Sequence, residues 1–428
     1  MKILLVNTHS TLNSGDTGIV LAQIKLLKSC LPQVSIALTS RTPEIDRAFY
    51  APLGIKVHPP ITPAPGVFTG NWQKCGGVVE NLINLKVKWE LLAEIKDSDL
   101  IISSGGGYFY SYGKYFPGPT FLQHYLHLKL ALFWNKPVVF FPQSFGPFAN
   151  SPASRLCKSI LQNENVLKIF VREKISRRLL LDLLGGNGGG KVAFCPDLVF
   201  LLEPTESRQV DNVLSSLRRP VLALTLRDWH FPGVKEAAQK QAAREKYLNS
   251  MMEVSSSFLK RFGGTVVVVP QVKGPDVLEN DTTISREFLK RSGEATERNN
   301  ILLFPANVLN SPENIIALLS RTDLVLATRF HSAIFAMLAK TPVITVGYQH
   351  KASGMLRELG LERFLVDISE TSSGKILAMM DELMKNRAKW REKIVKSVSD
   401  AREMIYAGPA DTLRGFQIRY SQSRPPIT

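Results

Sequence analysis

The chain has 428 residues, of which 44% are hydrophobic and 21% are charged, and its formal net charge is +16. These proportions are close to the average of globular proteins, so they exclude a disordered, low-complexity or fibrous chain. No apolar run reaches about 18 residues, so no membrane-spanning helix is predicted. The length allows two or three domains, and 53 basic against 37 acidic residues favour an anionic partner.

The positive charge is spread along the chain, without an arginine-rich arm or a recognisable RNA-binding module. It favours an anionic small molecule or an anionic membrane surface, and no nucleic-acid partner is expected. The first residues, MKILLVN, are followed directly by polar residues, which predicts a first strand of a cytoplasmic protein and no signal peptide. Cys30, Cys75, Cys157 and Cys195 are not spaced as zinc ligands or as a disulfide framework, so no metal site is expected.

Short apolar segments alternate with helix-length segments along the whole chain. In the first half, the expected strands cover 2–7, 35–40, 99–105, 137–143, 168–173 and 191–197. In the second half, they cover 220–227, 265–271, 300–305, 323–330 and 342–348. Most are continuously apolar, as strands are when helices cover both faces of a parallel sheet. The pattern predicts an α/β protein with two Rossmann-like, doubly wound parallel sheets that face a cleft.

The alternation breaks once, at 202–219, where the sequence becomes polar before Pro220 opens a new strand. We therefore predict an N-terminal domain over 1–205 and a C-terminal domain over 218–375. Residues 376–428 predict a basic helical tail that packs back on the first domain. Residues 109–120 (FYSYGKYFPGPT) predict a long aromatic loop, which is a candidate lid or binding surface.

Polar residues and glycines follow the first-half strands at their carboxyl ends, where ligands of such sheets bind. Asn13, Gly15 and Asp16 belong to NSGD at the start of a helix, a suitable place for an anion or sugar hydroxyls. Helix capping explains this motif equally well. Gly105 and Gly106 allow a ligand to approach the backbone closely, although a tight turn would also require them.

Arginines end strands in both halves of the chain. Arg172 ends the segment KIFVR, Arg227 ends LALTLR, and the polar Gln143 ends PVVFFPQ. Arginine binds phosphate or carboxylate in a planar, bidentate manner, and each charge-assisted hydrogen bond contributes about 1.5–3 kcal/mol. A lone arginine after a strand is usually solvated or salt-bridged, but two in equivalent positions favour an anionic ligand.

The strongest cluster is the segment LATRFHSAIFAMLAKTPVITVGYQHK at 326–351. Arg329 and His331 lie at the turn between a strand and the next helix. Tyr348 ends the following strand, and Lys351 comes three residues later. Cations and a histidine at strand ends can together bind an anion and transfer a proton. A capping histidine with surface cations is the simpler alternative.

The motifs occur together in an order that resembles the polysaccharide pyruvyl transferase family. The segments that carry the resemblance are NSGD at 13–16, SSGGG at 103–107, PQSFGP at 142–147, VREKIS at 171–176, CPD at 195–197, LR at 226–227, RFHSAIFA at 329–336 and PVITVGYQHK at 342–351. The resemblance implies a GT-B-like arrangement of two Rossmann-like domains, with the acceptor on the first and the donor on the second. It also implies phosphoenolpyruvate as donor, a sugar as acceptor, a pyruvate ketal as product, and no required metal or cofactor.

The resemblance further implies roles for individual residues. In similar enzymes, the arginine and histidine of an RxH motif and a downstream lysine surround the donor, and they correspond to Arg329, His331 and Lys351. We expect His331 to be the catalytic general acid, which contributes about 10²–10⁴ in rate. Asp16 is expected to be a base or a group that orients hydroxyls. The other expected substrate-binding residues are Arg172, Arg227, Asn13, Gly15, Gly105, Gly106, Gln143, Ser332 and Tyr348.

Two other functions stay open. A nucleotide-sugar glycosyltransferase of the same architecture would use a pair of glutamates, and Glu362 and Glu370 have that spacing, but the intervening RFLVDIS predicts a strand. A non-catalytic anion-binding protein is the second alternative. The acceptor sugar can be lipid-linked or polymeric, and the basic tail is compatible with contact at the anionic inner face of a membrane. The sequence does not indicate an oligomeric state.

Overall fold

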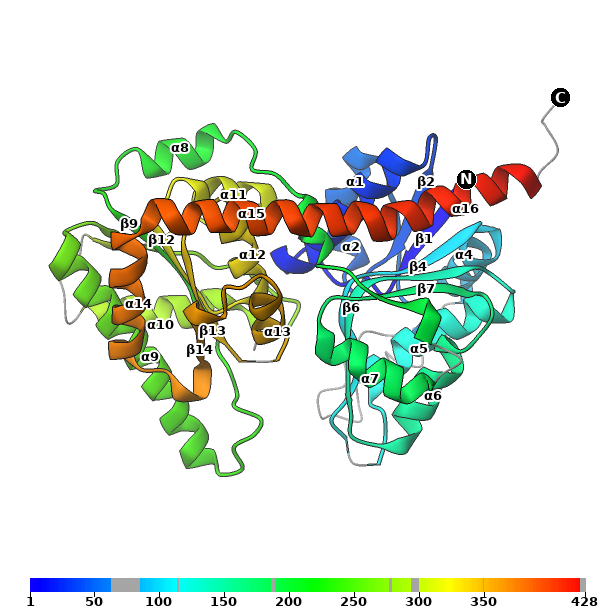
Figure 1. Cartoon of the computed structure of the whole chain (residues 1–428), viewed down its shortest axis with the longest axis horizontal. Coiled ribbons are helices and arrows are strands. Elements are labelled where there is room, and N and C mark those ends of the chain that lie inside the picture. Colours follow the sequence, from blue (N-terminus) through cyan, green and yellow to red (C-terminus); the bar gives the residue numbers. More distant parts are fainter. Residues whose placement is uncertain are drawn as a thin grey trace. The chain divides into compact units, whose positions relative to one another are not determined.

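The computed structural model describes residues 1–62, 85–113, 115–185, 189–276, 279–293, 300–348 and 350–423, with only the backbone described at 85–88, 350–352 and 423. The chain forms two compact units. The first unit comprises Met1–Thr11, Ile19–Leu201 and Ala401–Thr428, and the second comprises Leu12–Gly18 and Leu202–Asp400. Each unit is built around its own sheet with helices packed against it (Figure 1).

The first unit contains a parallel sheet with the strand order β3-β2-β1-β4-β6-β7-β8, and β5 pairs with β6. Its strands are β1 (Lys2–Val6), β2 (Ser35–Thr39), β3 (Lys56–His58), β4 (Leu100–Ser103), β5 (Gly106–Ser111), β6 (Val138–Phe148), β7 (Val166–Val171) and β8 (Val192–Phe194). Its helices are α1 (Ser14–Cys30), α2 (Pro43–Tyr50), α4 (Leu85–Asp97), α5 (Pro119–Phe133), α6 (Ser151–Leu161) and α7 (Lys174–Leu184).

The second unit contains a six-stranded parallel sheet with the order β11-β10-β9-β12-β13-β14. The strands are β9 (Val221–Thr225), β10 (Thr265–Val268), β11 (Ile301–Leu303), β12 (Leu324–Ala327), β13 (Val343–Gly347) and β14 (Leu365–Asp367). The chain winds outward from β9 to β11 and then crosses to the other side of β9. This is the doubly wound order, and its switch point lies between β9 and β12.

Helices flank the second sheet in Figure 1. They are α8 (Arg208–Leu214), α9 (Ala237–Phe262), α10 (Asp281–Gly293), α11 (Pro312–Ser320), α12 (Phe330–Leu338), α13 (His350–Glu358) and α14 (Ser373–Lys385). Every residue of β9, β10, β12 and β13 is buried, as the continuous apolar runs predict. Helix α12 is also buried along its length from Ser332 to Leu338, so it is a core helix. The predicted α/β class with two Rossmann-like sheets is confirmed.

Two strands of the first unit were not among the predicted ones. The short β3 was not predicted, and β5 occupies the first part of the predicted aromatic loop. The ring of Phe109 in β5 is buried and lies 5.6 to 6.1 Å from the rings of Phe121, Phe140 and Phe145. This packing places β5 beside β6, and β6 runs to Phe148, beyond the predicted end at 143. The contacts join residues far apart in sequence, so local pattern did not indicate them.

The unit boundaries also differ from the predicted domains. Residues Leu12–Gly18 belong to the second unit although they lie within the predicted first domain. The expected tail divides, because α15 (Arg387–Ile405) begins in the second unit, while its last residues and α16 (Asp411–Ser423) belong to the first. Arg402 in α15 donates a hydrogen bond to the carbonyl of Phe200 within the first unit, at 2.8 Å.

Among the described helices, none is both long and apolar enough to cross a membrane. Cys30, Cys157 and Cys195 are free thiols, and burial raises the pKa of both Cys157 and Cys195. Cys75 lies outside the described residues. Within the described part of the chain, no group of three or more histidine, cysteine or acidic side chains is arranged to hold a metal ion.

Candidate anion-binding site at the carboxyl edge of the second sheet

Polar side chains gather at the carboxyl ends of four strands of the second unit. Arg227 follows β9, Gln271 follows β10, Arg329 follows β12 and Tyr348 follows β13. Strands β10 and β12 both pair with β9, so these side chains leave the sheet at neighbouring positions around its switch point. This is the place where sheets of this topology bind ligands.

Arg329 forms a buried ion pair. Only 7% of this residue is exposed, and its Nε and Nη2 atoms donate to Oδ1 of Asp281 at 3.1 and 2.5 Å. Oδ2 of Asp281 accepts the main-chain N–H groups of Gln271 and Val272, at 3.1 and 3.0 Å. Burial acts to lower the pKa of Arg329, but the Asp281 carboxylate outweighs it and the pKa is raised. The edge of the guanidinium formed by Nε and Nη2 is therefore occupied by the protein itself.

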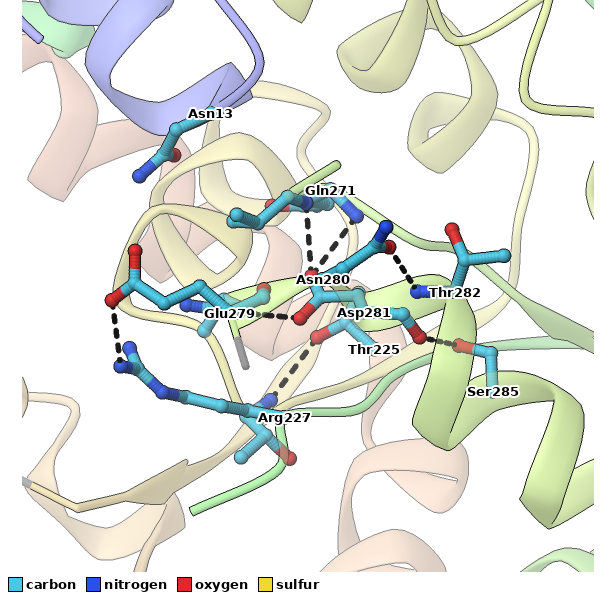
Figure 2. Close-up of polar contacts among 12 residues, drawn as sticks. Asn13, Thr225, Arg227, Gln271, Glu279, Asn280, Asp281, Thr282 and Ser285 are labelled. Carbon is cyan, nitrogen blue, oxygen red and sulfur yellow. Dashed lines mark hydrogen bonds and ion pairs between the residues drawn. The ribbon is translucent and has the colours of Figure 1, made fainter. Parts of the chain in front are cut away.

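Arg227 has the opposite arrangement (Figure 2). Its guanidinium lies 4.4 Å from the ring centre of Tyr348 and 5.1 Å from that of Trp229, and Nη1 donates to the Tyr348 hydroxyl at 2.5 Å. Nη2 has a long contact of 3.5 Å with the Glu279 carboxylate. Nε is buried and has no hydrogen-bond partner among the described residues. The Nε–Nη2 edge, which binds carboxylate or phosphate with parallel N–H groups, therefore has only the long contact with Glu279 among the described residues, and its Nε is buried.

The N-terminal segment Leu12–Gly18 contributes to this site. Asn13 forms an antiparallel bridge with Val272, and the N–H of Ser14 donates to the carbonyl of Gln271 at 3.1 Å. Oδ1 of Asn13 accepts the N–H of Gly15 at 3.0 Å, so Asn13 caps α1, as the simpler explanation of NSGD predicted. Figure 2 shows the Asn13 side chain above Gln271 and Glu279.

His331 lies in the first turn of α12, next to Gly15. A Cβ atom on Gly15 would lie 2.2 Å from Nδ1 of His331, so only glycine allows the start of α1 to approach the imidazole. The ring of Phe330 lies edge-on to His331 at 4.9 Å between ring centres. Asp16 lies in the same turn of α1 as Gly15. The expected acid and the expected base therefore belong to the same unit, but on different helices.

Arg172, one of the predicted residues of the first unit, lies in a closed network of buried charges. Arg172 is buried, and its Nε donates to the hydroxyl of Ser144 at 2.8 Å while Nη1 pairs with Asp197 at 2.5 Å. Ser144 in turn donates to the buried carboxylate of Glu173 at 3.0 Å. Gln143 is fully buried, with its Nε2 3.4 Å from the hydroxyl of Ser103 and its Oε1 without a hydrogen-bond partner among the described residues. This network ties β6 to β7 and to the segment that follows β8.

Two buried histidines lie next to this network. The Nδ1 atoms of His124 and His127 both donate to Oδ1 of Asn7, at 2.9 and 3.0 Å, and Nε2 of His127 accepts the N–H of Ile61 at 3.0 Å. Nδ2 of Asn7 donates to Ser103 at 3.2 Å. Burial lowers the pKa of His127 to about 4 and that of His124 well below its ordinary value. Both imidazoles are therefore neutral near pH 7, and they hold the end of β1 against α5.

The structure explains the first-unit glycines by packing within the chain. A Cβ on Gly105 would lie 2.9 Å from the Ile19 side chain and from the Pro142 carbonyl oxygen, and one on Gly106 would lie 2.4 Å from the Tyr108 ring. Gly106 also has φ +127°, which L side chains rarely adopt. Packing within the chain and, at Gly106, the backbone conformation therefore account for these glycines, and a role in ligand binding stays a prediction.

Of the remaining predicted residues, the structure places the side chain of Ser332 but not that of Lys351. The hydroxyl of Ser332 donates to Oε1 of Gln271 at 2.8 Å. The side chain of Lys351 lies outside the described residues, although its backbone belongs to α13. Glu362 and Glu370 are separated by β14, as the sequence predicted.

Four residues of the site were missed by sequence reasoning, namely Trp229, Gln271, Glu279 and Asp281. Gln271 had a signal, because the second-half strand TVVVVPQ ends in the same Pro-Gln pair as the first-half strand PVVFFPQ. Glu279 and Asp281 had none, since a carboxylate near the start of a helix usually indicates only a favourable interaction with the helix dipole.

The fold is shared with solved structures of GT-B type. The crystal structure of Anabaena HepE in complex with UDP and glucose superposes over 99% of both chains, with a TM-score of 0.56 and 13% identity. UDP-GlcNAc 2-epimerase from Methanocaldococcus jannaschii covers 90% of this chain and 93% of its own, with a TM-score of 0.54 and 13% identity. At these identities, the likeness shows the fold alone.

The sequence comparison defines the family. The pattern described as Polysaccharide pyruvyl transferase matches residues 13–350, and the chain therefore belongs to this family. The amylovoran biosynthesis protein AmsJ of Erwinia amylovora is 23% identical over 441 aligned positions, which cover 97% of this chain and 100% of that protein. The predicted family is confirmed.

Proposed function

We propose that the protein transfers the pyruvyl group of phosphoenolpyruvate to a sugar, as a ketal, during the biosynthesis of an extracellular or cell-envelope polysaccharide. Membership of the pyruvyl transferase family supports the reaction class. The similarity to an amylovoran biosynthesis protein supports a polysaccharide or its lipid-linked precursor as the acceptor.

The observation that carries this proposal is the available Nε–Nη2 edge of Arg227. Phosphoenolpyruvate has a phosphate and a carboxylate, so its site must offer N–H donors that the protein does not already use. Arg227 offers such an edge, and its other end is held by Tyr348. Glu279 is 35% exposed and only loosely paired, so an incoming phosphate can displace it from Arg227. Arg329, whose corresponding edge binds Asp281, then acts by holding the site together.

The proposed chemistry requires one proton and two hydroxyls. His331 gives a proton to the methylene carbon of phosphoenolpyruvate, which leaves an oxocarbenium-like centre at the neighbouring carbon. A sugar hydroxyl adds to this carbon and loses its proton to a base, for which Asp16 is the candidate. A second hydroxyl of the same sugar then displaces phosphate and gives up its proton to the departing phosphate, so that the products are the ketal and inorganic phosphate. The close contact with Gly15 holds the imidazole of His331 in one place during these steps.

The acceptor is proposed to bind the first unit. Three aromatic residues beyond β5, namely Tyr112, Tyr115 and Phe116, are 64%, 78% and 62% exposed. Asn150 donates to the hydroxyl of Ser111 and the carbonyl of Gly113, at 2.6 and 2.7 Å, and thereby holds the backbone on both sides of Tyr112. Exposed aromatic rings suit the apolar faces of sugar rings.

Calorimetric titration with phosphoenolpyruvate tests the donor. We expect saturable binding by the wild type, and a loss of about 10- to 100-fold in affinity for Arg227→Ala, the size of one or two charge-assisted hydrogen bonds. Arg227→Lys should not restore it, because a lysine has no planar edge. Arg261→Ala is the matched control, since Arg261 pairs with Asp381 on the exposed surface of the same unit.

A nucleotide-sugar glycosyltransferase is the second candidate, because the fold resembles that of HepE, which has been crystallised with UDP and glucose. Binding of UDP together with no binding of phosphoenolpyruvate would establish this alternative. Binding of phosphoenolpyruvate without phosphate release, in the presence of a sugar acceptor stripped of pyruvate, would instead indicate a non-catalytic protein. We propose that turnover needs no added metal, so it should persist in EDTA.

A further inference from the structure

Gln271 is a second potential ligand-binding side chain at the carboxyl edge of the second sheet. It follows β10 and is only 2% exposed. Its main-chain N–H donates to Asp281 at 3.1 Å, and its carbonyl accepts the N–H and the hydroxyl of Ser14 at 3.1 and 2.9 Å. The hydroxyl of Ser332 donates to its side-chain Oε1 at 2.8 Å. The backbone and one end of the amide are therefore held from three sides.

The other end of this amide is unsatisfied. Nε2 of Gln271 is buried and has no hydrogen-bond partner among the residues that the structure describes. A buried N–H without an acceptor costs about 1–3 kcal/mol, so a fixed one needs an explanation. Because the contact with Ser332 uses Oε1, the group left over is a donor. Its natural partner is a ligand oxygen that only accepts hydrogen bonds, as in a phosphate or carboxylate.

Two further features indicate that Nε2 of Gln271 belongs to the same sheet edge as the proposed anion site at Arg227. Gln271 follows β10 and contacts Ser332 in α12, the helix after β12, and β10 and β12 pair with opposite sides of β9, which delivers Arg227. Gln271 and Arg227 therefore follow adjacent strands at the same edge of the sheet, and adjacent strands are about 4.8 Å apart. In addition, no side chain caps the N-terminus of α12, where the helix dipole favours negative charge.

We propose that Gln271 and the start of α12 form a second anion subsite beside Arg227. The two subsites together would select a small ligand with two anionic groups, and Gln271 would bind one of these groups while Arg227 binds the other. This inference rests on the proposed function in one respect: it takes phosphoenolpyruvate, with its phosphate and its carboxylate, as that ligand.

The test compares two substitutions, of which Gln271→Glu changes a single group of the side chain. Gln271→Glu keeps an oxygen for Ser332 and replaces the N–H donor by a second acceptor, whereas Gln271→Ala removes both. We expect affinity for phosphoenolpyruvate to fall about 10- to 100-fold in Gln271→Ala, as for a lost hydrogen bond to a charged group. The fall should be larger in Gln271→Glu, because its carboxylate repels the ligand, and it should lessen as the pH falls and the glutamate becomes protonated.

Controls separate binding from structure. Gln241→Ala, at an exposed position of α9, should bind phosphoenolpyruvate like the wild type. Thermal unfolding of both Gln271 variants shows whether the second unit stays folded. A Gln271→Glu protein that is folded and binds phosphoenolpyruvate as well as the wild type would overturn the inference while leaving the proposed function intact.

Inorganic phosphate is the second probe. If the wild type binds phosphate but not phosphoenolpyruvate, the proposed donor is wrong, and weaker phosphate binding by Gln271→Glu would still support the subsite. Equal phosphate binding by the wild type and Gln271→Glu in that case would overturn it. If the wild type binds neither probe, both the proposed function and the subsite are overturned.

Discussion

Both sheets carry an arginine after a strand, yet the two arginines differ in how completely their guanidinium groups are paired. In the first unit, Arg172 is buried against Asp197 and Ser144, and the neighbouring Glu173 completes the network. In the second unit, Arg227 is held at one end by Tyr348 and keeps its Nε–Nη2 edge nearly free of protein partners. The same sequence feature has therefore produced a structural network in one place and a potential binding group in the other.

The different pairing of Arg172 and Arg227 indicates which of the two arginines can bind a ligand. A closed network of buried charges holds elements together and is costly to break. An open set of donors at a sheet edge is costly to leave open, so it indicates a place where a ligand could complete it. Arg329 lies in the second unit with Arg227, but like Arg172 it is paired with a buried carboxylate, that of Asp281.

The largest expected effect comes from breaking the Arg329–Asp281 pair. Asp281→Ala leaves a buried guanidinium and two main-chain N–H groups without their acceptor, so we expect a loss of about 3–5 kcal/mol in the free energy of unfolding. Urea denaturation measures it. Arg227→Ala removes a hydrogen bond to Tyr348 and a long pair with Glu279 but leaves no buried charge unpaired, so it should cost less, about 1.5–3 kcal/mol. Equal losses in the two variants would contradict the division into closed and open groups.

The next effect concerns turnover. His331→Asn should lower kcat by about 10²–10⁴, the usual contribution of a general acid, while affinity for phosphoenolpyruvate changes only a few-fold. Phosphate release in the presence of acceptor measures kcat, and calorimetry measures affinity. His230→Asn, an exposed histidine of the same unit, is the control. A His331 variant with unchanged turnover would show that this residue has only a structural part in the site.

The smallest expected effect is the pH dependence of stability that comes from the buried histidine His127 of the first unit. The pKa of His127 is lowered to about 4 by burial, whereas an exposed histidine titrates near 6.5. The unfolded chain therefore takes up a proton between about pH 6.5 and 4 while the folded chain does not, and stability falls as the pH drops through this window. From pH 7 to 5 the expected loss from His127 is on the order of 2 kcal/mol.

Urea unfolding of the wild type and His127→Gln at both pH values isolates this contribution. The variant should lose less stability than the wild type between pH 7 and 5. His124 has a pKa shifted in the same direction, so it adds to the loss in both proteins. Identical losses in the two proteins would mean that His127 takes up its proton in the folded chain, and that the network around Asn7 is open to water.

Much of the fold could be predicted because parallel sheets covered on both faces require continuous apolar strands. The runs at 220–227, 265–271 and 323–330 contain β9, β10 and β12, and their observed ends differ by only a few residues. The aromatic segment at 109–120 was harder, because β5 forms only when Phe109 packs among rings from α5 and β6. Packing between distant segments leaves no periodic pattern in the sequence.

By itself, the sequence determined the α/β class, the family, and the residues that stand at strand ends, since these follow from hydrophobic pattern and from motifs in a defined order. Only the tertiary structure decided which of those residues are free to bind. Arg329 and Arg227 look alike in sequence, but Asp281 satisfies the first, while Glu279 only touches the second. The reason is physical: a hydrogen bond depends on where the partner atom lies, and that is set by contacts between strands and helices far apart in the chain.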